Sequence, residues 1–598
     1  MIKKRVLLGA AYSSIEPLGL LHLGGLARNL GCERKFYLVK NHDFQPFFDM
    51  VKDYRPDIVG FTVYTGNHIQ LHEAFKKLKR DFPNIQTAVG GYHPTYFPLE
   101  SINHADFVVM SEGFKAFRDI INENAEKGII PLKELEKFPL PDRVAFYKDY
   151  PEHGKSKIKS MITGTGCPYG CTYCYNSSTL EDLKISPKTA EHFVRQGMGE
   201  RLFPQNTRDL EDILKEGREI AENWPTEMIY FQDDVFGFDD KVGGFLDQLS
   251  ETWPSQVDIP FHAQMRWEMT KSDKRLDYIR SAGGFGLTLA IEAADPDMRK
   301  NILDRHMNDE LVFEGMEKLM DKGFKVRTEQ ITGLPWGVTP NITSMNLDAD
   351  LEMLEYNVRL IRMTGGPTMA WASTLVPYLG TKIYNTCEEF GFYFSDNSDI
   401  QDTFFERSVL RFLKEWLGPK RAKKFKDNQE VWLSQDELER YRDQNAELRR
   451  IFNFVSLVPE GHKLARSYLE SSLPFSFERI GQETKKFLEN RSDQESVKIM
   501  GKIRNLHNYF NGLENCEIKK EIINLIPYFA VLPKSELAIE RVINYSVKKK
   551  ETKLDTITLS TAIRHHLYDE VLYYTGNKSN TSFKFNEQVN PRQSDNKV

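Results

Sequence analysis

Strand-like and helix-like segments alternate along the first 125 residues, and this alternation constrains the fold more than any other feature of the sequence. The strand-like segments are short apolar runs at residues 5–10, 57–64, 86–91 and 107–110. Apolar residues at helical spacing lie between them, at residues 18–30 and 69–80. Because strands that alternate with helices favour a covered parallel sheet, we predict a Rossmann-like, doubly wound α/β domain over residues 1–125.

Small and polar residues stand at the ends of the predicted strands. These ends are residues 10–14, 62–67, 90–95 and 111–113. In a doubly wound sheet, ligands bind outside the carboxyl ends of the strands, where the strand order reverses. The same small residues would also serve simply to close the turns. The pattern favours a ligand site at this edge.

A second series of strands follows residues 126–158, a segment rich in proline and charge that we expect to be a linker. Its strand-like segments are residues 159–163, 228–232, 261–264, 286–291, 325–331 and 368–374. Helical patterns lie between most of them, for example at residues 207–223, 242–253 and 308–322. Units of this kind predict a barrel, or part of one, over residues 159–385.

Strand signals fade after residue 385. A capping box at residues 434–437 precedes apolar residues at helical spacing, and residues 386–576 read as a mostly α-helical C-terminal domain. The last segment, residues 577–598, is polar with few apolar anchors. We expect it to be a disordered tail.

The composition is that of an ordinary globular protein. The chain has 598 residues, 40% apolar and 28% charged, with a formal net charge of −6. These values exclude a fibrous or largely disordered chain, and so mild a charge gives no electrostatic sign of nucleic-acid binding. No apolar stretch approaches the roughly 18 residues of a membrane-spanning helix, and the short apolar run after Arg5 lacks a clear cleavage site. We expect a cytoplasmic protein without membrane or nucleic-acid partners.

Three of the six cysteines, Cys167, Cys171 and Cys174, lie within eight residues on a glycine-containing segment that follows a predicted strand. Thiolates so spaced can converge on an iron–sulfur cluster, and three of them leave one iron open to an external ligand. The alternative is a zinc site with His153 or His192 as fourth ligand. Zinc sites usually contain a second Cys-x-x-Cys pair, which this sequence lacks, so the spacing favours the cluster.

The spacing Cys-x₃-Cys-x-Tyr-Cys resembles that of the radical S-adenosylmethionine (SAM) superfamily, and the N-terminal sheet resembles that of its cobalamin-binding class. The resemblance covers residues 1–385, and supporting stretches occur in the expected order at residues 17–20, 90–95, 112–113, 140–143, 231–236, 263–266, 290–292, 333–335 and 377–381. It implies a cobalamin-binding domain, then a radical SAM partial (β/α)6 barrel, then the helical region. Trp336 and Val338 depart from the family's pattern, which puts only the local turn in doubt.

The resemblance implies that Cys167, Cys171 and Cys174 hold a 4Fe–4S cluster whose open iron binds SAM. Electron transfer from the reduced cluster would cleave SAM to methionine and a 5′-deoxyadenosyl radical, which abstracts a hydrogen atom from the substrate. The implied SAM contacts are Tyr173 at the adenine, Asp233 or Asp234 at the amino or ribose groups, Arg266 at the carboxylate and Glu292 at the ribose hydroxyls. The structural alternatives are a packing role for the tyrosine, helix capping for the acidic pair and an ion pair for the arginine.

For cobalamin, the resemblance implies contacts from residues at the strand ends of the first domain, namely Thr62, Tyr64, Gly90, Gly91, Thr95, Glu112 and Gly113. The sequence lacks the Asp-x-His-x-x-Gly motif that supplies a cobalt-binding histidine in cobalamin mutases. We therefore expect no histidine of the protein on cobalt, and we expect His93 to be a turn residue or to lie at the corrin edge.

The implied function is methyl transfer from SAM through cobalamin to an unactivated carbon of a small-molecule or peptide substrate, with flavodoxin or ferredoxin as electron donor. The alternative is ring formation or oxidation, as in the anaerobic Mg-protoporphyrin ester cyclases. A tRNA methylthiotransferase is disfavoured, because those enzymes carry three further N-terminal cysteines and this N-terminal region has only Cys32. A non-enzymatic zinc- or cobalamin-binding regulator would leave the barrel motifs without a role. We expect the helical C-terminal region to enclose or select the substrate.

Overall fold

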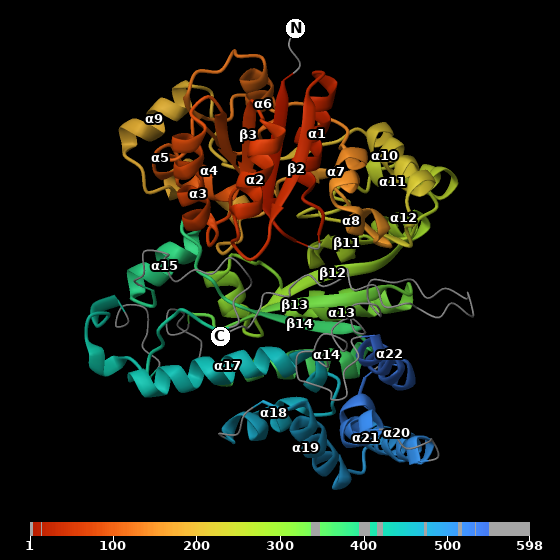
Figure 1. Cartoon of the computed structure of the whole chain (residues 1–598). Coiled ribbons are helices and arrows are strands. Elements are labelled where there is room, and N and C mark those ends of the chain that lie inside the picture. The colour runs from red at the N-terminus through yellow and green to blue at the C-terminus, as the bar shows by residue number, and fades with distance from the viewer. Residues whose placement is uncertain are drawn as a thin grey trace.

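The computed structural model describes residues 4–13, 15–335, 347–393, 407–415, 423–471, 475–511, 517–532 and 534–548. Trp336, Val338 and the expected tail at residues 577–598 lie outside these residues. Figure 1 shows a first sheet with its helices at one end of the molecule, a second sheet in the middle and a group of helices at the other end. Among the described residues, none of the helices is long and apolar enough to cross a membrane.

The first sheet has six parallel strands in the order β2-β1-β3-β4-β5-β6. They are β1 (Arg5–Ala11), β2 (Glu33–Val39), β3 (Ile58–Thr62), β4 (Gln86–Gly90), β5 (Phe107–Val109) and β6 (Gly128–Ile130). The order reverses between β1 and β3, and this reversal opens a crevice at the carboxyl ends of the strands. The prediction of a doubly wound sheet is confirmed.

Helices cover both faces of this sheet because successive side chains of a strand point to opposite faces. Val6 and Leu8 belong to the apolar cluster on one face, whereas Leu7 and Val59 belong to the cluster on the other. The helices of the domain are α1 (Leu18–Asn29), α2 (Gln45–Tyr54), α3 (His68–Asp81), α4 (Tyr92–Tyr96), α5 (Pro98–Ser101) and α6 (Phe114–Ile121).

The segment that we expected to be a linker, residues 126–158, is structured. It contributes β6 as the edge strand of the first sheet, paired with β5, and two short helices, α7 (Arg143–Asp149) and α8 (Pro151–Lys155). The expectation failed because a strand of three residues, only partly buried, gives almost no apolar signal within a proline- and charge-rich stretch. The first sheet therefore extends beyond residue 125.

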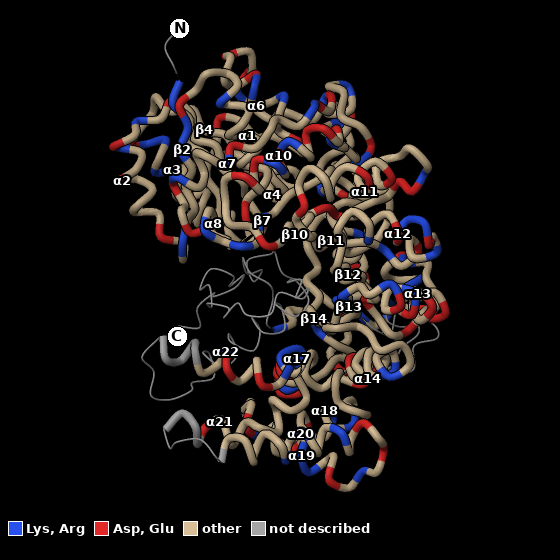
Figure 2. The backbone as a smooth tube through the Cα atoms, turned by 90° about the vertical axis from the view of Figure 1, so that its right-hand side faces the viewer, with Lys and Arg blue, Asp and Glu red and all other residues tan. Residues whose placement is uncertain are grey.

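The second sheet also has six parallel strands, in the order β7-β10-β11-β12-β13-β14. They are β7 (Ile158–Met161), β10 (Met228–Phe231), β11 (Phe261–Met265), β12 (Gly284–Glu292), β13 (Lys325–Thr332) and β14 (Met369–Thr374). Their covering helices include α10 (Leu210–Asn223), α11 (Phe245–Gln256), α12 (Asp273–Ser281), α13 (Asp309–Asp321) and α14 (Leu347–Thr364). Strand order follows chain order from one edge to the other, which is the topology of a partial (β/α)6 barrel. Lys and Arg are interspersed with Asp and Glu along the outer helices α12 and α13 (Figure 2).

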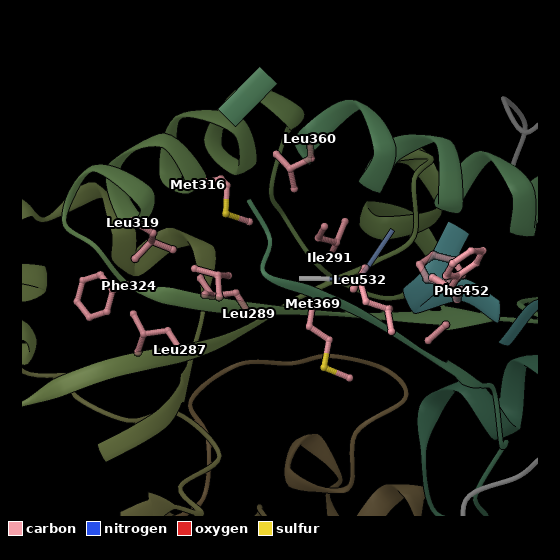
Figure 3. Close-up of a cluster of buried hydrophobic side chains, with 14 of the residues drawn as sticks. Leu287, Leu289, Ile291, Met316, Leu319, Phe324, Leu360, Met369, Phe452 and Leu532 are labelled. Carbon is pink, nitrogen blue, oxygen red and sulfur yellow. The ribbon is translucent and has the colours of Figure 1, made fainter. Parts of the chain in front are cut away.

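The C-terminal helices share one apolar core with the barrel. Figure 3 shows Leu289 and Ile291 of β12 and Met369 of β14 together with Phe452 and Leu532 from the helical region. The mostly helical region is confirmed, and it is packed onto the barrel rather than held apart from it. Its helices are α15 (Lys382–Phe390), α17 (Gln435–Val455), α18 (Gly461–Glu470), α19 (Phe477–Glu489), α20 (Gln494–Asn511), α21 (Glu517–Phe529) and α22 (Ser535–Lys548).

Candidate functional site

The three clustered cysteines lie on the loop that follows the first barrel strand. This loop starts with β8 (Gly164–Thr165), which pairs antiparallel with β9 (Asn206–Thr207). Gly166 adopts a φ of +80°, and a Cβ atom there would come within 2.7 Å of the carbonyl oxygen of Pro204. Only glycine fits this approach, so the residue before Cys167 is dictated by the path of the loop.

The thiols fit a cluster with several iron atoms better than a single zinc ion. Cys171 is buried and Cys167 and Cys174 are half-buried. The ligand atoms of these three residues do not form a group lying within 4.8 Å of one another, although such a group exists elsewhere among the described residues. Thiolates of a multi-iron cluster bind separate iron atoms and lie farther apart than ligands of one zinc ion.

Neither histidine of the zinc alternative is grouped with the cysteines. His153 packs against Tyr12 and Phe146, and His192 contacts Gln196 one turn along α9 (Pro187–Arg195). Burial raises the pKa of the Cys174 thiol to about 12, so its thiolate form requires compensating positive charge nearby. The iron ions of a cluster would supply such charge, as would a zinc ion.

Two arginines hold the cysteine loop. Arg201 donates to the carbonyl oxygen of Pro168 at 3.0 Å and also to that of Cys167. Arg266, which follows β11, donates to the Sγ of Cys171 at 3.0 Å and lies over the ring of Tyr169, 3.8 Å from its centroid. Arg266 also makes two hydrogen bonds to the carboxylate of Glu268. The structure therefore places Arg266 at the cysteines. It also shows Arg266 paired with Glu268, which is the ion pair that we gave as the structural alternative.

The two neighbouring aspartates after β10 face different surroundings. Asp233 is 3% exposed and accepts hydrogen bonds from the backbone N–H and the hydroxyl of Thr163. Burial raises its pKa to about 7. Asp234 accepts from the backbone N–H of Gly166 at 3.2 Å, bonds the side chain of Asn176 and lines the cavity described below. Asp234 is thus the member of the pair that a ligand can reach.

Tyr173 and Glu292 meet in a buried group that also contains Arg305. The hydroxyl of Tyr173 donates to Glu292 at 2.5 Å and accepts from Arg305 at 3.0 Å. Arg305 further donates to the carbonyl oxygen of Ala290 at 2.6 Å. Glu292 has a φ of +70°, a conformation that a non-glycine residue keeps only where its surroundings hold it. The cysteine loop is therefore fastened to the end of β12.

A cavity of about 310 Å³ joins the first sheet to the cysteine loop. Its first wall comes from the switch point of the sheet and its second from the mouth of the barrel. The barrel contributes Ile162, Thr165, Gly166, Asn176, Phe203, Pro204, Gln232 and Asp234. The first domain contributes residues that include Leu8, Leu18, Gly19, Leu20, His22, Gly60, Thr62, Gly90, Gly91, Tyr92, Glu112, Gly113 and Phe114.

Glycines hollow out the sheet side of this cavity. A Cβ atom at Gly60 would lie 3.3 Å from Leu8, and one at Gly91 would lie 3.0 Å from Thr62. Thr62, Gly90, Gly91, Glu112 and Gly113, all expected at cobalamin, line the space. The largely apolar slot over small residues fits a portion of cobalamin such as its nucleotide tail.

Two residues expected at cobalamin, Tyr64 and Thr95, do not line this cavity. Thr95 is fully buried, and its hydroxyl donates to Gly91 O and accepts from Ser111 N, each at 2.8 Å. It ties two strand-end turns together instead of lining the cavity. Tyr64 is 45% exposed and is not among the cavity residues; its ring packs against Tyr92. The sequence does not predict which side chains of a turn face a cavity, whereas the side chains of a strand alternate regularly between the two faces of a sheet.

Several residues that the sequence did not single out are part of the site. Asn176 lies two residues after Cys174 and bonds Asp234, and Asn206 donates to Glu112 across the two domains. His22 lines the cavity from α1, and Tyr175 stacks on Tyr92 with ring centroids 5.2 Å apart. Their closeness to the motifs was the only available signal, because their partners come from distant segments.

Comparison with known proteins identifies two domains. The family model described as B12 binding domain matches residues 4–121, and that of the Radical SAM superfamily matches residues 161–338. An uncharacterized methyltransferase of Pyrococcus horikoshii is 23% identical over 305 residues, covering 47% of this chain and 61% of the relative. The cytidylyl-2-hydroxyethylphosphonate methyltransferase of Streptomyces wedmorensis is 22% identical over 322 residues, covering 48% and 59%.

The bacteriochlorophyllide d C-8(2)-methyltransferase of Chlorobaculum tepidum is 24% identical over 195 residues, covering 31% of this chain and 42% of the relative. The chain thus spans at most 61% of the length of these curated relatives. Among solved structures, the radical SAM methyltransferase TsrM from Kitasatospora setae, with cobalamin and a [4Fe-4S] cluster bound, matches at a TM-score of 0.47 and 14% identity, covering 66% of this chain and 76% of TsrM.

Proposed function

We propose that this chain, a cobalamin-binding radical SAM enzyme by its two domains, transfers a methyl group from SAM by way of cobalamin to a carbon atom of a small-molecule or peptide substrate. The observation that carries the proposal is the cavity shared by the switch point of the first sheet and the cysteine loop of the barrel. A methyl group carried between two cofactors requires their binding sites to open into one space. The three methyltransferases among the relatives support the same reaction class.

Each wall of the cavity has its own task in this proposal. Cys167, Cys171 and Cys174 would hold the 4Fe–4S cluster, and the strand-end glycines would receive cobalamin. When bound, the cluster supplies electrons for the cleavage of SAM and cobalamin supplies a carrier for the methyl group. The apolar lining, which includes Leu8, Leu18 and Phe203, excludes water from the space between them.

The polar side chains at the barrel end of the cavity would bind and orient SAM. Asp234 and Asn176 face the space and are suited to the amino or ribose groups. Tyr173 and Glu292 would contact the adenosine while Arg305 holds both of them in place. Arg266 would have to exchange part of its pairing with Glu268 to reach the carboxylate of SAM. Flavodoxin or ferredoxin is the proposed electron donor.

The first experiment is anaerobic purification and reconstitution with iron, sulfide and hydroxocobalamin, followed by an absorption spectrum after desalting. We expect both an iron–sulfur band and retained corrin bands. Gly19→Leu fills the cavity side of α1, where a Cβ atom meets nothing within 4 Å, and should reduce the retained corrin while leaving iron and sulfide unchanged. Gly501→Leu, on α20 and equally unobstructed, is the matched control and should retain both cofactors.

The second experiment separates methyl transfer from the competing reaction, ring formation or oxidation. Reconstituted enzyme receives SAM with a deuterated methyl group, a reductant and candidate substrates, and products are analysed by mass. A product that gains the labelled methyl group supports the proposal. A product that loses hydrogen atoms and carries no label would indicate that the enzyme is a cyclase or oxidase and not a methyltransferase. If the reconstituted chain retained the cluster but no corrin, methyl transfer through cobalamin would be contradicted.

A further inference from the structure

A group of histidines lies in the first domain, away from the cavity that serves the proposed reaction. His68 is the first residue of α3 and His72 follows one turn later, whereas His93 lies in α4. All three side chains are buried, and none of them lines the cavity. His68 stacks on His93 with ring centroids 4.2 Å apart, and His72 stacks on His104 at 4.1 Å.

The imidazoles of His68 and His93 and the carboxylate of Glu100 converge on one point. One potential ligand atom from each lies within 4.8 Å of the other two. The Nε2 atom of His93 is buried without a hydrogen-bond partner and lies 3.8 Å from Oε1 of Glu100. This separation is too long for a hydrogen bond, and it is close to the roughly 3.3 Å between two ligands that each bind zinc at about 2.0 Å.

We propose that His68, His93 and Glu100 bind a divalent first-row transition-metal ion, with zinc as the ion that fits this donor set. Two imidazole nitrogens and one carboxylate oxygen are ligands that zinc takes in proteins, and a water molecule can complete the coordination. The cysteines that would hold the cluster are not part of this group.

The surroundings support the ligands. Thr65 Oγ1 lies 3.1 Å from Nδ1 of His93 and fixes the orientation of that ring, as partners of metal-binding histidines do. Nδ1 of His72 lies 3.5 Å from the carboxylate of Glu100 and steadies it from the other side. The backbone N–H of Gly66 donates to Nδ1 of His68 at 3.1 Å. Coordination of the ion by His68 would replace this hydrogen bond, and the bond to the metal is stronger than the hydrogen bond that it replaces.

The ion would fasten the turns that shape the cavity. His68 begins the helix after β3, and His93 and Glu100 lie in the two helices after β4. Tyr92, which precedes His93, lines the cavity and stacks on Tyr175, the residue after Cys174. In this position the ion would hold the helices that follow β3 and β4 together beside the cysteine loop.

The test uses full-length chain without an affinity tag, with its iron–sulfur cluster reconstituted so that the three cysteines are occupied. The protein is freed of loosely bound metal, titrated with Zn²⁺ or Co²⁺, desalted and analysed for bound metal and visible absorption. We expect zinc retained in equimolar amount, a higher Tm with zinc, and a Co²⁺ difference spectrum, taken against the same cluster-loaded protein without Co²⁺, that contains no new thiolate charge-transfer band. His93→Gln and Glu100→Gln should each weaken zinc binding by more than the about 100-fold that loss of an outer-shell partner can cost. His104→Gln, which alters a stacked ring outside the ligand set, should bind zinc as the wild type does.

Opposite results overturn the proposal. Zinc binding that survives both His93→Gln and Glu100→Gln, or that disappears in Cys171→Ala but not in these variants, would assign the ion to the cysteines. A new thiolate band in the Co²⁺ difference spectrum of the wild type would do the same even if the histidine variants failed to fold. A wild-type chain that retains no zinc would show that the histidines pack without metal.

Discussion

Asp233 and Asp234 are neighbours in the chain, yet their side chains have different tasks because the backbone after β10 points them in different directions. Asp233 is buried against Thr163, just before the cysteine loop, and supports the start of that loop. Asp234 lies at the cavity wall with Asn176. A single acidic motif thus combines a structural residue with one that can meet a ligand.

Exchanging each aspartate for alanine should separate these tasks. Asp234→Ala removes a charged hydrogen-bond acceptor at the cavity, worth about 1.5–3 kcal/mol, and should weaken SAM binding about 10- to 100-fold with little change in Tm. Asp233→Ala leaves the N–H and hydroxyl of Thr163 unpaired and should lower Tm. Equilibrium dialysis with labelled SAM and differential scanning calorimetry check the two outcomes. If Asp233→Ala were to lose SAM binding with Tm intact, the assignments would have to be reversed.

At the scale of elements, the long helix α17 supports a turn of the barrel. Tyr441 and Asn445 on α17 donate to Asp350 at 2.9 and 2.7 Å, and Asp350 accepts from the backbone N–H of Gly333 at 2.8 Å. Gly333 has a φ of +67° and follows β13. The helical region therefore reaches the barrel turn within residues 331–335, a stretch that the resemblance to the radical SAM superfamily implies to flank the adenine.

Removing the amide of Asn445 should loosen this turn without disturbing the cysteine loop. Asn445→Leu takes away one of the three donors to Asp350 and should raise the KM for SAM several-fold, with iron content unchanged. Gln444→Leu, which alters the adjacent side chain of α17 on the face toward Leu469, is the control and should leave KM unchanged. Equal effects of both substitutions would mean that α17 acts only by packing.

The sequence predicts the elements better than it predicts their partners. All six barrel strands were expected from the sequence, although several of them contain polar residues, as β7 and β13 do. β2 was not expected: its first three residues, Glu33 to Lys35, are charged, and only its last four residues, Phe36 to Val39, form a buried apolar run. The bond between Asp350 and Asn445 joins residues 95 positions apart, and no local pattern encodes it. The three cysteines could be grouped from the sequence because one loop carries them all, whereas the walls of the cavity come from two domains.

At the scale of the whole molecule, a buried network of charges joins the two sheets through the connecting segment. Arg143 of α7 is fully buried and pairs with Glu16 at 3.1 Å and with Glu216 of α10. Arg208 pairs with Glu216 at 2.6 Å. Despite burial, which favours the neutral acid, Arg208 and Arg143 hold the pKa of Glu216 at about 2.

His22 makes this junction sensitive to acid. Burial and the charge of Arg208 lower its pKa from 6.5 to about 4, and its Nδ1 contacts the carbonyl oxygen of Pro139 at 2.6 Å. Since protonation is harder in the folded chain than in the unfolded one, the stability from neutral His22 is present above pH 6.5 and is lost as pH falls toward 4. The shift corresponds to about 3 kcal/mol at most. His22→Gln should unfold at a lower urea concentration than the wild type at pH 8, and this gap should narrow at pH 5; a constant gap would contradict the assignment.

The charge network also predicts how the two sheets unfold. Arg143→Met leaves the carboxylate of Glu16, in the first domain, buried without a cationic partner, although Tyr147 and the backbone N–H of Ser160 still donate to it. Breaking a buried pair in this way costs about 3–5 kcal/mol. Because Glu216 on the barrel side keeps Arg208, the loss falls on the first domain, and calorimetry should show that domain melting ahead of the barrel. Arg218→Met removes a surface pair with Glu211 on the same helix as Glu216, and this change should cost no more than about 1 kcal/mol without splitting the transition. If Arg143→Met shifted a single transition by as little as this control, the two sheets would be held together by their apolar contacts and not by the buried charges.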